Sequence, residues 1–398
     1  MTTPPNFVVA VAFRSVCDDQ ARVLAKHGML RLYALCTRRL TAGIPREVTR
    51  LCPPLGLLVY LGARFLPPFQ GESFRFALYP LYDQWVLTHL RPGDHIISSY
   101  AYANACFAWA RRHGGKTFLD GGNSHPDNFW QILNEEHRRW NCRYPPVARF
   151  YYERARRTVE HVDYVLCPSS FVRNSFLARG FKPQQILDVF YPVNLSCFTP
   201  SPQNRPPQRP LTIINTGMLS LRKGTPYLLE AFRLIRQQVP DARLLLTENV
   251  SDSVKPILAR YQDLPIEWSP SLSHDKLAER LRSADMFILL SLEEGLVRAA
   301  QEAMACGLPV ILTPNTGTND FVVEGVNGSV VPIRNPEATA EAALAWWDRI
   351  RGGYRVPVSN LQQQLSFERL ERFFLGHLRR LGLLVEQPLA DNQRGGGQ

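Results

Sequence analysis

The stretch Met286–Thr313 reads MFILLSLEEGLVRAAQEAMACGLPVILT, two apolar runs separated by a segment of helical character. The first run, Met286–Leu290, contains no polar residue, which is typical of a parallel strand covered on both faces. A helix is expected over Val297–Cys306, because the Gly-Leu-Pro that follows is a helix stop signal. A second strand is expected over Val310–Thr313. The stretch therefore predicts a β-α-β unit of a parallel sheet.

The same alternation extends on the N-terminal side of this unit. Further strands and helices are expected over Leu211–Ile214, Thr225–Val239, Arg243–Thr247, Ile266–Trp268 and Ser273–Arg282. In doubly wound sheets, ligands bind beyond the carboxyl ends of the strands. The loops after Thr216, Thr247 and Leu290 are therefore the expected ligand site, and the polar loop Pro314–Asp320 could close over it.

The first half of the 398 residues shows weaker signals of the same kind. Its strand and helix candidates are Phe7–Phe13, His95–Ser99, Tyr102–Arg112, Lys116–Leu119, Asn128–Trp140 and Tyr164–Cys167. Between the halves, the proline-rich stretch Pro200–Pro210 suits neither a helix nor a central strand, because proline lacks a backbone donor.

These patterns predict an α/β protein with two Rossmann-like, doubly wound domains facing across a cleft. We expect an N-terminal domain over 1–198, a linker over 199–210 and a C-terminal domain over 211–365. A helix over 366–385 could pack back on the N-terminal domain, and residues 386–398 are expected to be a disordered tail.

The composition limits the classes of partner. With 45% hydrophobic and 20% charged residues the chain is globular, and its net charge is +11. A basic protein suits nucleic acid, anionic membranes or phosphorylated substrates. No nucleic-acid-binding motif accompanies the charge, so no nucleic-acid partner is expected. The eight cysteines form no C-x-x-C pair, which favours reduced thiols in the cytoplasm over a zinc site.

No secretory signal or membrane-spanning helix is expected. The N-terminal sequence lacks a basic start followed by a long apolar core. The apolar stretch Leu51–Phe69 contains four prolines and Arg64, which argues against a spanning helix. It is interpreted either as a packed segment of the first domain or as a segment lying on a membrane surface.

Positive charge is concentrated in the loop GMLSLRKG that joins the first strand of the second half to its helix. Gly217 lets the backbone approach a ligand, and Arg222 and Lys223 place two cations beside Gly224. A diphosphate is bound by cationic donors and exposed backbone amides. The alternative is a solvated basic loop at a helix start.

Two carboxylates flank the turn between the expected strand Met286–Leu290 and the expected helix Val297–Cys306. Glu294 precedes Gly295, which permits a tight turn, and Glu302 follows eight residues after Glu294. The amides at Leu296 and Val297 begin a helix, whose N-terminus favours anions. Carboxylates accept hydrogen bonds from hydroxyl pairs of a sugar or ribose. The alternative is that Glu302 is an ordinary surface residue of the helix.

Three stretches of the sequence are informative in combination: GMLSLRKGTPYLLEAF (217–232), EEGLVRAAQEAMACGLP (293–309) and FVVEGVNGSVVP (321–332). In this order and at these distances they resemble the donor domain of the family 4 retaining glycosyltransferases, which have the GT-B architecture. The resemblance covers about 211–345 well. It covers the first half more loosely, through 163–170 and 192–198.

The resemblance implies a retaining glycosyltransferase that moves a sugar from a nucleoside-diphosphate sugar. Glu302 would hold the nucleotide ribose and Glu294 the transferred sugar, while Lys223 and Arg222 would bind the diphosphate. The C-terminal domain would take the donor, and the N-terminal domain an unknown carbohydrate, lipid-linked or small-molecule acceptor. Neither metal nor cofactor is implied beyond the donor. The enzyme is expected to be cytoplasmic, and the basic charge and the apolar Leu51–Phe69 stretch would also allow peripheral association with the inner face of the membrane.

The chain departs from the family at three places. Met218 stands where many members have arginine, and Pro192-Val193-Asn194 replaces the usual Gly-Val-Asp. Where members often have a catalytic histidine, this sequence reads FLDGGNSH, so either Asp120 or His125 could face the reacting carbon. These departures leave two alternatives, a non-catalytic protein that binds nucleotide sugars and an inverting GT-B enzyme.

Glu135 and Glu136 follow on the next predicted helix. They could line the acceptor side, although solvated carboxylates are the favoured interpretation. A dinucleotide-binding oxidoreductase is disfavoured, because G-x-G-x-x-G is missing after the first strand.

Overall fold

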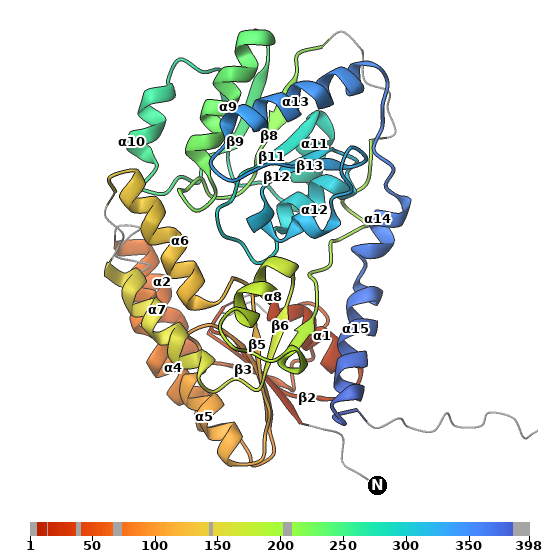
Figure 1. Ribbon diagram of the computed structural model, residues 1–398. Helices are drawn as coiled ribbons and strands as arrows, with labels where there is room; N and C mark the ends of the chain where they lie inside the picture. Colours follow the sequence, from red (N-terminus) through yellow and green to blue (C-terminus); the bar gives the residue numbers. More distant parts are fainter. Residues whose placement is uncertain are drawn as a thin grey trace, which may run out of the picture.

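The computed structural model describes residues 6–13, 15–36, 41–66, 74–142, 146–201 and 209–384, which form two α/β domains (Figure 1). Each domain is built on one parallel sheet with helices on both faces. The predicted α/β class with two Rossmann-like domains is therefore confirmed. Residues 202–208 of the expected linker and the expected tail over 386–398 lie outside the described residues.

The N-terminal sheet has seven parallel strands in the order β3-β2-β1-β4-β5-β6-β7. Its strands are β1 (Phe7–Ala10), β2 (Leu30–Leu35), β3 (Thr49–Leu51), β4 (His95–Ser99), β5 (Thr117–Asp120), β6 (Tyr164–Cys167) and β7 (Ile186–Asp188). Its helices are α1 (Cys17–Lys26), α2 (Pro53–Phe65), α4 (Tyr79–Leu87), α5 (Asn104–Arg112), α6 (Pro126–Arg139), α7 (Pro146–Val159) and α8 (Ser170–Leu177).

The C-terminal sheet has six parallel strands in the order β10-β9-β8-β11-β12-β13. Its strands are β8 (Thr212–Ile214), β9 (Arg243–Thr247), β10 (Ile266–Ser269), β11 (Met286–Leu289), β12 (Val310–Leu312) and β13 (Gly328–Val330). Its helices are α9 (Thr225–Gln238), α10 (Lys255–Leu258), α11 (His274–Ser283), α12 (Arg298–Ala305), α13 (Pro336–Arg351) and α14 (Ser359–Gln364). Within each sheet, the first four strands of the domain in chain order lie side by side in the spatial order third, second, first, fourth. This is the strand order of the Rossmann fold.

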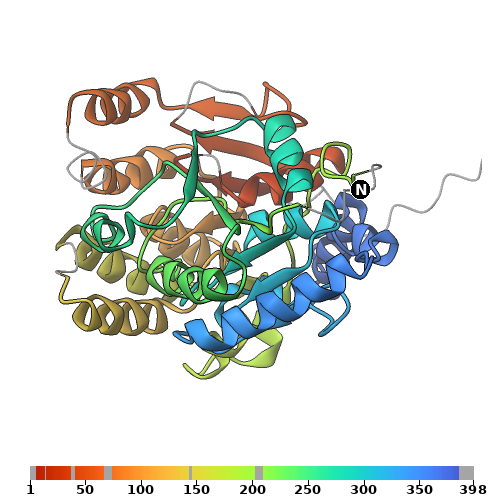
Figure 2. The same cartoon turned by 90° about the horizontal axis from the view of Figure 1, so that it is seen from above.

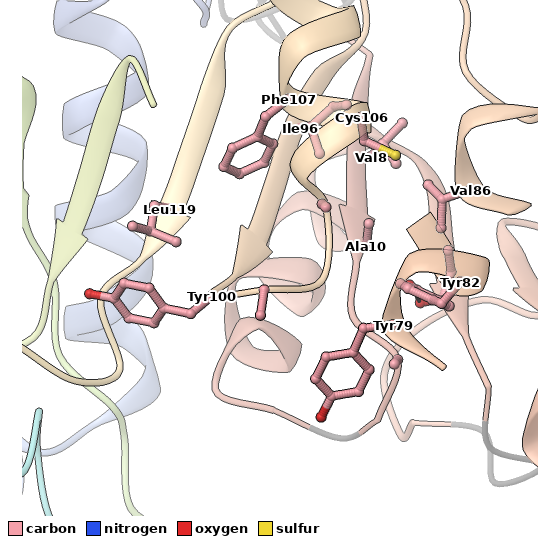
Figure 3. Packing of buried hydrophobic residues seen from close by; sticks show 14 of the residues in the cluster. Val8, Ala10, Tyr79, Tyr82, Val86, Ile96, Tyr100, Cys106, Phe107 and Leu119 are labelled. Carbon is pink, nitrogen blue, oxygen red and sulfur yellow. Dashed lines mark hydrogen bonds between the residues drawn. The ribbon is translucent and has the colours of Figure 1, made fainter. Parts of the chain in front are cut away.

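Apolar side chains from two helices cover one face of the N-terminal sheet (Figure 3). Tyr82 and Phe107, on α4 and α5, are almost completely buried in the same cluster as Val8 and Ile96 of the strands. The Tyr82 hydroxyl donates a hydrogen bond of 2.8 Å to the carbonyl of Ala34. A buried phenol needs such a partner, so this side chain adds apolar area without leaving a polar group unsatisfied.

The chain returns to the N-terminal domain at its C-terminal end, through α15 (Phe367–Arg380), which lies along one side of that domain in Figure 1. Ser366 caps this helix by accepting a hydrogen bond of 3.3 Å from the Arg369 amide. Leu370, Phe374 and Leu378 recur at helical spacing and are completely buried among the side chains of β1, β2 and α1. The helix thus contributes one apolar face to the N-terminal core.

We predict that Phe374→Ala lowers the free energy of unfolding by about 3–5 kcal/mol, because a buried phenyl ring is replaced by a cavity. Denaturant unfolding measures this change. Phe373→Ala is the matched control, since the neighbouring ring is 43% exposed and its loss should cost less than half as much. Equal effects of the two substitutions would contradict the packing of α15 described above.

Candidate active site

A cavity of about 330 Å³ lies beyond the carboxyl ends of β8, β9 and β10. This is the edge at which a doubly wound sheet binds ligands, and it includes two of the three predicted loops. Its polar lining consists of Asn215, Thr216, Gly217, Thr247, Asn249, Ser269, Ser271, His274, Arg280 and Glu302. The loop Ser269–Leu272 after β10, which the sequence did not single out, supplies one wall of the cavity.

Glu302 and Gly217 line this cavity together, although 85 residues separate them in the chain. Gly217 has a φ of 111°, a backbone conformation that a side chain would strain. Burial raises the pKa of Glu302 to about 7, and the charge of Arg298 only partly opposes this rise. The cavity therefore holds a carboxyl group that changes its charge near neutral pH.

Arg222, Lys223 and Glu294 form an ion cluster on the same two loops. The Lys223 Nζ lies 2.6 Å, and the Arg222 Nη1 2.8 Å, from Oε1 of Glu294. Burial alone would raise the pKa of Glu294, but the two cations outweigh it and hold that pKa below its usual value. Burial lowers the pKa of Lys223, an effect that the charge of Glu294 opposes. The structure thus brings together the three charged groups predicted for the donor.

Gly224 allows this loop to pack tightly. It has a φ of 67°, and a Cβ atom there would lie 2.0 Å from the carbonyl oxygen of Leu290. The loop after β8 is therefore pressed against the end of β11, which places both predicted loops beside each other. Lys223 does not line the 330 Å³ cavity, whereas Gly217 at the other end of its loop does.

Glu293 is a site residue that the sequence analysis missed. Its side chain is completely buried, and its Oε1 accepts a hydrogen bond of 2.8 Å from the backbone amide of Ser124 in the N-terminal domain. Its Oε2 lies 3.6 Å from Nη1 of Arg222. Burial raises the pKa of Glu293, and Arg222 opposes that rise. The sequence shows two adjacent glutamates, Glu293 and Glu294. Nothing in that pattern indicates that Glu293 contacts the other domain while Glu294 pairs with Arg222 and Lys223.

The start of α12 differs from the predicted anion site. The amide of Val297 donates a hydrogen bond of 2.9 Å to Oγ1 of Thr318, so it is already satisfied by the protein. Leu296 is buried with the N-terminal core. At Gly295, a Cβ atom would lie 2.3 Å from the carbonyl oxygen of Gly122. Gly295 and Leu296 therefore contact the N-terminal domain, whereas the Val297 amide is bonded within the C-terminal domain. For that amide to bind a phosphate, its hydrogen bond to Thr318 would have to break.

Neither candidate for the first-domain catalytic position lines the cavity. Asp120 is completely buried and accepts hydrogen bonds from Tyr191 (2.7 Å) and Gln20 (3.1 Å). Burial raises its pKa to about 7, although the Tyr191 hydrogen bond opposes this. His125 begins α6, where its Nδ1 accepts a hydrogen bond of 3.2 Å from the Asp127 amide. Burial lowers the pKa of His125 to about 4, so the ring is neutral at pH 7.

The interpretation of Glu136 as a solvated carboxylate was wrong. Its side chain is completely buried, and it accepts hydrogen bonds from Arg334 (2.7 Å), Tyr227 (2.6 Å) and Trp140 (2.8 Å). Arg334 also pairs with the half-exposed Glu135 at 2.9 Å. Because Arg334 and Tyr227 belong to the C-terminal domain, this carboxylate joins the domains and does not line an acceptor surface.

Two further interdomain contacts were not predicted. Arg298, in the first turn of α12, forms an ion pair with Asp19 of α1. Asp320 accepts a hydrogen bond of 2.6 Å from the amide of Ser170. The loop Pro314–Asp320 thus reaches the N-terminal domain, near the predicted site. Within the described part of the chain, no group of three or more His, Cys, Asp or Glu side chains is arranged to hold a metal ion.

The residues that form the cavity and the ion cluster lie within a region that matches a known sequence family. Residues 199–348 match the model of the family described as glycosyl transferases group 1. This region contains all the donor residues predicted from the sequence. The match covers the C-terminal domain as far as residue 348 and leaves the N-terminal domain outside it.

Curated relatives carry the same kind of name. The D-inositol 3-phosphate glycosyltransferase of Arthrobacter sp. is 29% identical over 176 residues, which cover 41% of this chain and 42% of that protein. A GDP-mannose-dependent alpha-(1-6)-phosphatidylinositol monomannoside mannosyltransferase of Mycolicibacterium smegmatis is 27% identical over 258 residues, 58% of this chain and 61% of that protein. The chain spans about half the length of the curated relatives it matches.

Similarity to solved structures extends over both domains. Anabaena Alr3699/HepE, solved in complex with UDP and glucose, superposes with a TM-score of 0.61 at 17% sequence identity. The superposition covers 94% of this chain and 99% of that chain. At this identity the likeness concerns the fold, which is the GT-B arrangement of two Rossmann-like domains.

Asp120 gives a prediction for stability. Its pKa rises from 3.8 to about 7 on folding, so its stabilising contribution is complete below pH 3.8 and lost as the pH rises through 7. Between these limits, the unfolding free energy of the wild type should fall relative to that of Asp120→Asn, with a slope of up to about 1.4 kcal/mol per pH unit. Denaturant unfolding at several pH values measures this difference. The exposed Asp252→Asn should follow the wild type, and parallel curves for Asp120→Asn would refute the assignment.

Proposed function

We propose that the protein is a retaining glycosyltransferase that moves a sugar from a nucleoside-diphosphate sugar to a carbohydrate or lipid-linked acceptor. The observation that carries the proposal is the cluster of Glu294, Arg222 and Lys223 next to a cavity lined by Glu302 and Gly217. Such a donor presents hydroxyl groups at both ends and negative charge between them. The cluster and the cavity offer matching groups in the same order.

The nucleoside would occupy the cavity, with Glu302 accepting hydrogen bonds from the ribose hydroxyls. The diphosphate would lie toward Arg222 and Lys223. Both cations share one oxygen of Glu294. When phosphate oxygens replace that oxygen as their partner, the Glu294 carboxylate becomes available to the hydroxyls of the sugar. This exchange keeps the two cations paired throughout, so no buried charge is left alone.

In the reaction, the bond between the anomeric carbon and the diphosphate oxygen breaks as charge grows on the leaving group. Arg222 and Lys223 stabilise that charge from fixed positions, which is the larger part of the protein's contribution. The acceptor hydroxyl attacks from the same face, and its proton passes to the leaving phosphate. Asp120 is completely buried and accepts hydrogen bonds from Gln20 and Tyr191 within the N-terminal domain, which supports this route over one in which Asp120 is a nucleophile. We propose that the transfer needs no metal, since these cations take its place.

The nature of the acceptor is part of the proposal. Two of the similar proteins are named for transfer to inositol phosphate and to a phosphatidylinositol mannoside. We infer an acceptor of this polar or lipid-linked kind, bound by the N-terminal domain, and a cytoplasmic enzyme working at the inner face of a membrane. None of the eight cysteines is in a disulfide, which fits a reducing compartment.

We predict that Lys223→Ala lowers turnover about 100-fold or more, because one preorganised cation is lost from the leaving group. Release of nucleoside diphosphate from the preferred donor, chosen by screening UDP- and GDP-sugars, measures this. Lys255→Ala is the matched control, since Lys255 forms an exposed pair with Asp252 and should leave turnover unchanged. Wild-type turnover in Lys223→Ala would remove this residue from the phosphate site. If no combination of donor and acceptor gives a product, the protein is a binding protein. If the anomeric configuration of the product is inverted relative to the donor, the retaining mechanism is excluded.

Glu302→Gln should weaken binding of the preferred nucleoside diphosphate about ten-fold at pH 8, because a charged acceptor of ribose hydroxyls is replaced by a neutral one. The difference should shrink as the pH falls below 7, where the raised pKa of Glu302 leaves the wild-type carboxyl protonated. Calorimetry measures the affinity of both proteins at each pH. Because the ligand is the same for both, the effect of its own protonation cancels in the comparison. Glu279→Gln on the exposed side of α11 should bind like the wild type. Equal affinity of Glu302→Gln and wild type at pH 8 would exclude Glu302 from the site.

A further inference from the structure

Helix α2 has an apolar outer face. Its inner side packs on the first domain through Leu55 and through Gly62, which lies against the ring of Phe74. A helix on the surface of a globular protein normally carries polar residues on its other side. Here the outward side has Arg64 as its one charged residue. The large side chains exposed there, with their exposed fractions, are Leu57 (48%), Leu58 (40%), Tyr60 (63%), Leu61 (38%), Phe65 (74%) and Leu66 (37%).

This concentration sets α2 apart from the rest of the described surface. Of the fourteen large hydrophobic side chains that are exposed among the described residues, six lie between 57 and 66. The others are spread over both domains. Scattered exposed apolar residues are normal, whereas a contiguous group marks a surface that another body covers.

The charge around α2 indicates what that body is. On α2 itself Arg64 is exposed, and the helix contains no acidic residue. Helix α7, on the same side of the molecule in both views, carries the exposed Arg149, Arg156 and Arg157 and the 42% exposed ring of Phe150 (Figures 1 and 2). Arg149 pairs with the exposed Glu153 and Arg156 with Asp127, so the three arginines outnumber their acidic partners. Apolar side chains beside cations match the interface of an anionic bilayer, where lipid tails and negative headgroups meet.

Two other arrangements fit less well. A second copy of the chain would bring two molecules of charge +11 together, which electrostatic repulsion opposes. A spanning helix needs about 30 Å of apolar length, whereas the 13 residues of α2 extend about 20 Å. No helix among the described residues is long and apolar enough to cross a membrane.

We propose that the outer face of α2 inserts into the interfacial region of an anionic phospholipid bilayer, with the arginines of α2 and α7 contacting the headgroups. The helix lies parallel to the membrane surface. Attachment of this kind combines two signals, apolar burial and charge, and so requires negatively charged lipid. The inference is independent of the donor chemistry, because none of these residues belongs to the donor site.

Sedimentation with phosphatidylcholine vesicles, prepared with and without phosphatidylglycerol, tests the proposal on the whole chain. The wild type should sediment with the anionic vesicles, less so as salt is raised, and remain in solution with the neutral ones. Tyr60→Glu combined with Phe65→Glu should lower binding at least ten-fold, since two aromatic rings that enter the interface become charged. Both rings are largely exposed, so the variant should keep the wild-type unfolding midpoint.

Val323→Glu combined with Val326→Glu is the matched control, because it adds the same charge at exposed apolar sites of the C-terminal domain. It should bind anionic vesicles like the wild type. Equal binding by the α2 variant, or no binding of the wild type to anionic vesicles, would overturn the proposal. A dimer seen by light scattering without lipid, and lost in the α2 variant, would assign this face to self-association. Stabilisation by UDP or GDP, measured in parallel, reports on the donor site separately.

Discussion

The buried carboxylate of Glu293 joins the two domains at the place where their sheets end. It accepts a hydrogen bond from the Ser124 amide on one side and lies beside Arg222 on the other. A completely buried carboxylate is costly unless it is hydrogen-bonded and near a positive charge, so both partners must stay in place. Because every strand pair in both sheets is parallel, the loops that carry these partners lie at the carboxyl edge of their sheets, and the Ser124–Glu293 hydrogen bond joins the two edges. The position of Arg222, and with it the adjacent ion cluster, therefore depends on the association of the domains.

Close backbone contact reinforces this junction. A Cβ atom at Gly295 would meet the carbonyl oxygen of Gly122, and one at Gly317 would lie 2.0 Å from the carbonyl oxygen of Gly295. With the loops touching at the centre, the space left for a ligand is displaced toward β8, β9 and β10, where the cavity is found. Gly217, at one end of the loop that carries Arg222 and Lys223, lines this cavity together with Glu302. In the proposed function, the ribose lies at Glu302 and the diphosphate at the two cations. This order is what a nucleotide sugar requires.

The sequence was most informative where structure is local. The strands Arg243–Thr247 and Tyr164–Cys167 were predicted with their observed bounds, and Arg222, Lys223 and Glu294 were singled out because they lie between a strand and a helix. Prediction from the sequence failed where the residue that determines a side chain's environment is distant in the chain. Glu136 looks like a surface residue until Arg334, nearly 200 residues away, is brought beside it. Likewise β3 has only three residues, Thr49–Leu51, and is held by pairing with β2, so no periodic pattern could reveal it.

The return of α15 to the first domain means that the polypeptide crosses between domains twice. The two crossings run together, since the Val193 amide donates a hydrogen bond of 3.0 Å to the carbonyl of Leu365, and Gly307 lies close to both Pro200 and Val358. Paired crossings at one margin behave as a hinge with a defined axis, which permits rotation about that margin and resists sliding or twisting. Opening is then greatest at the opposite margin, where α6 meets the C-terminal domain (Figure 1). At that margin α6 is joined to the C-terminal domain by Glu136, which accepts hydrogen bonds from Tyr227 and Arg334.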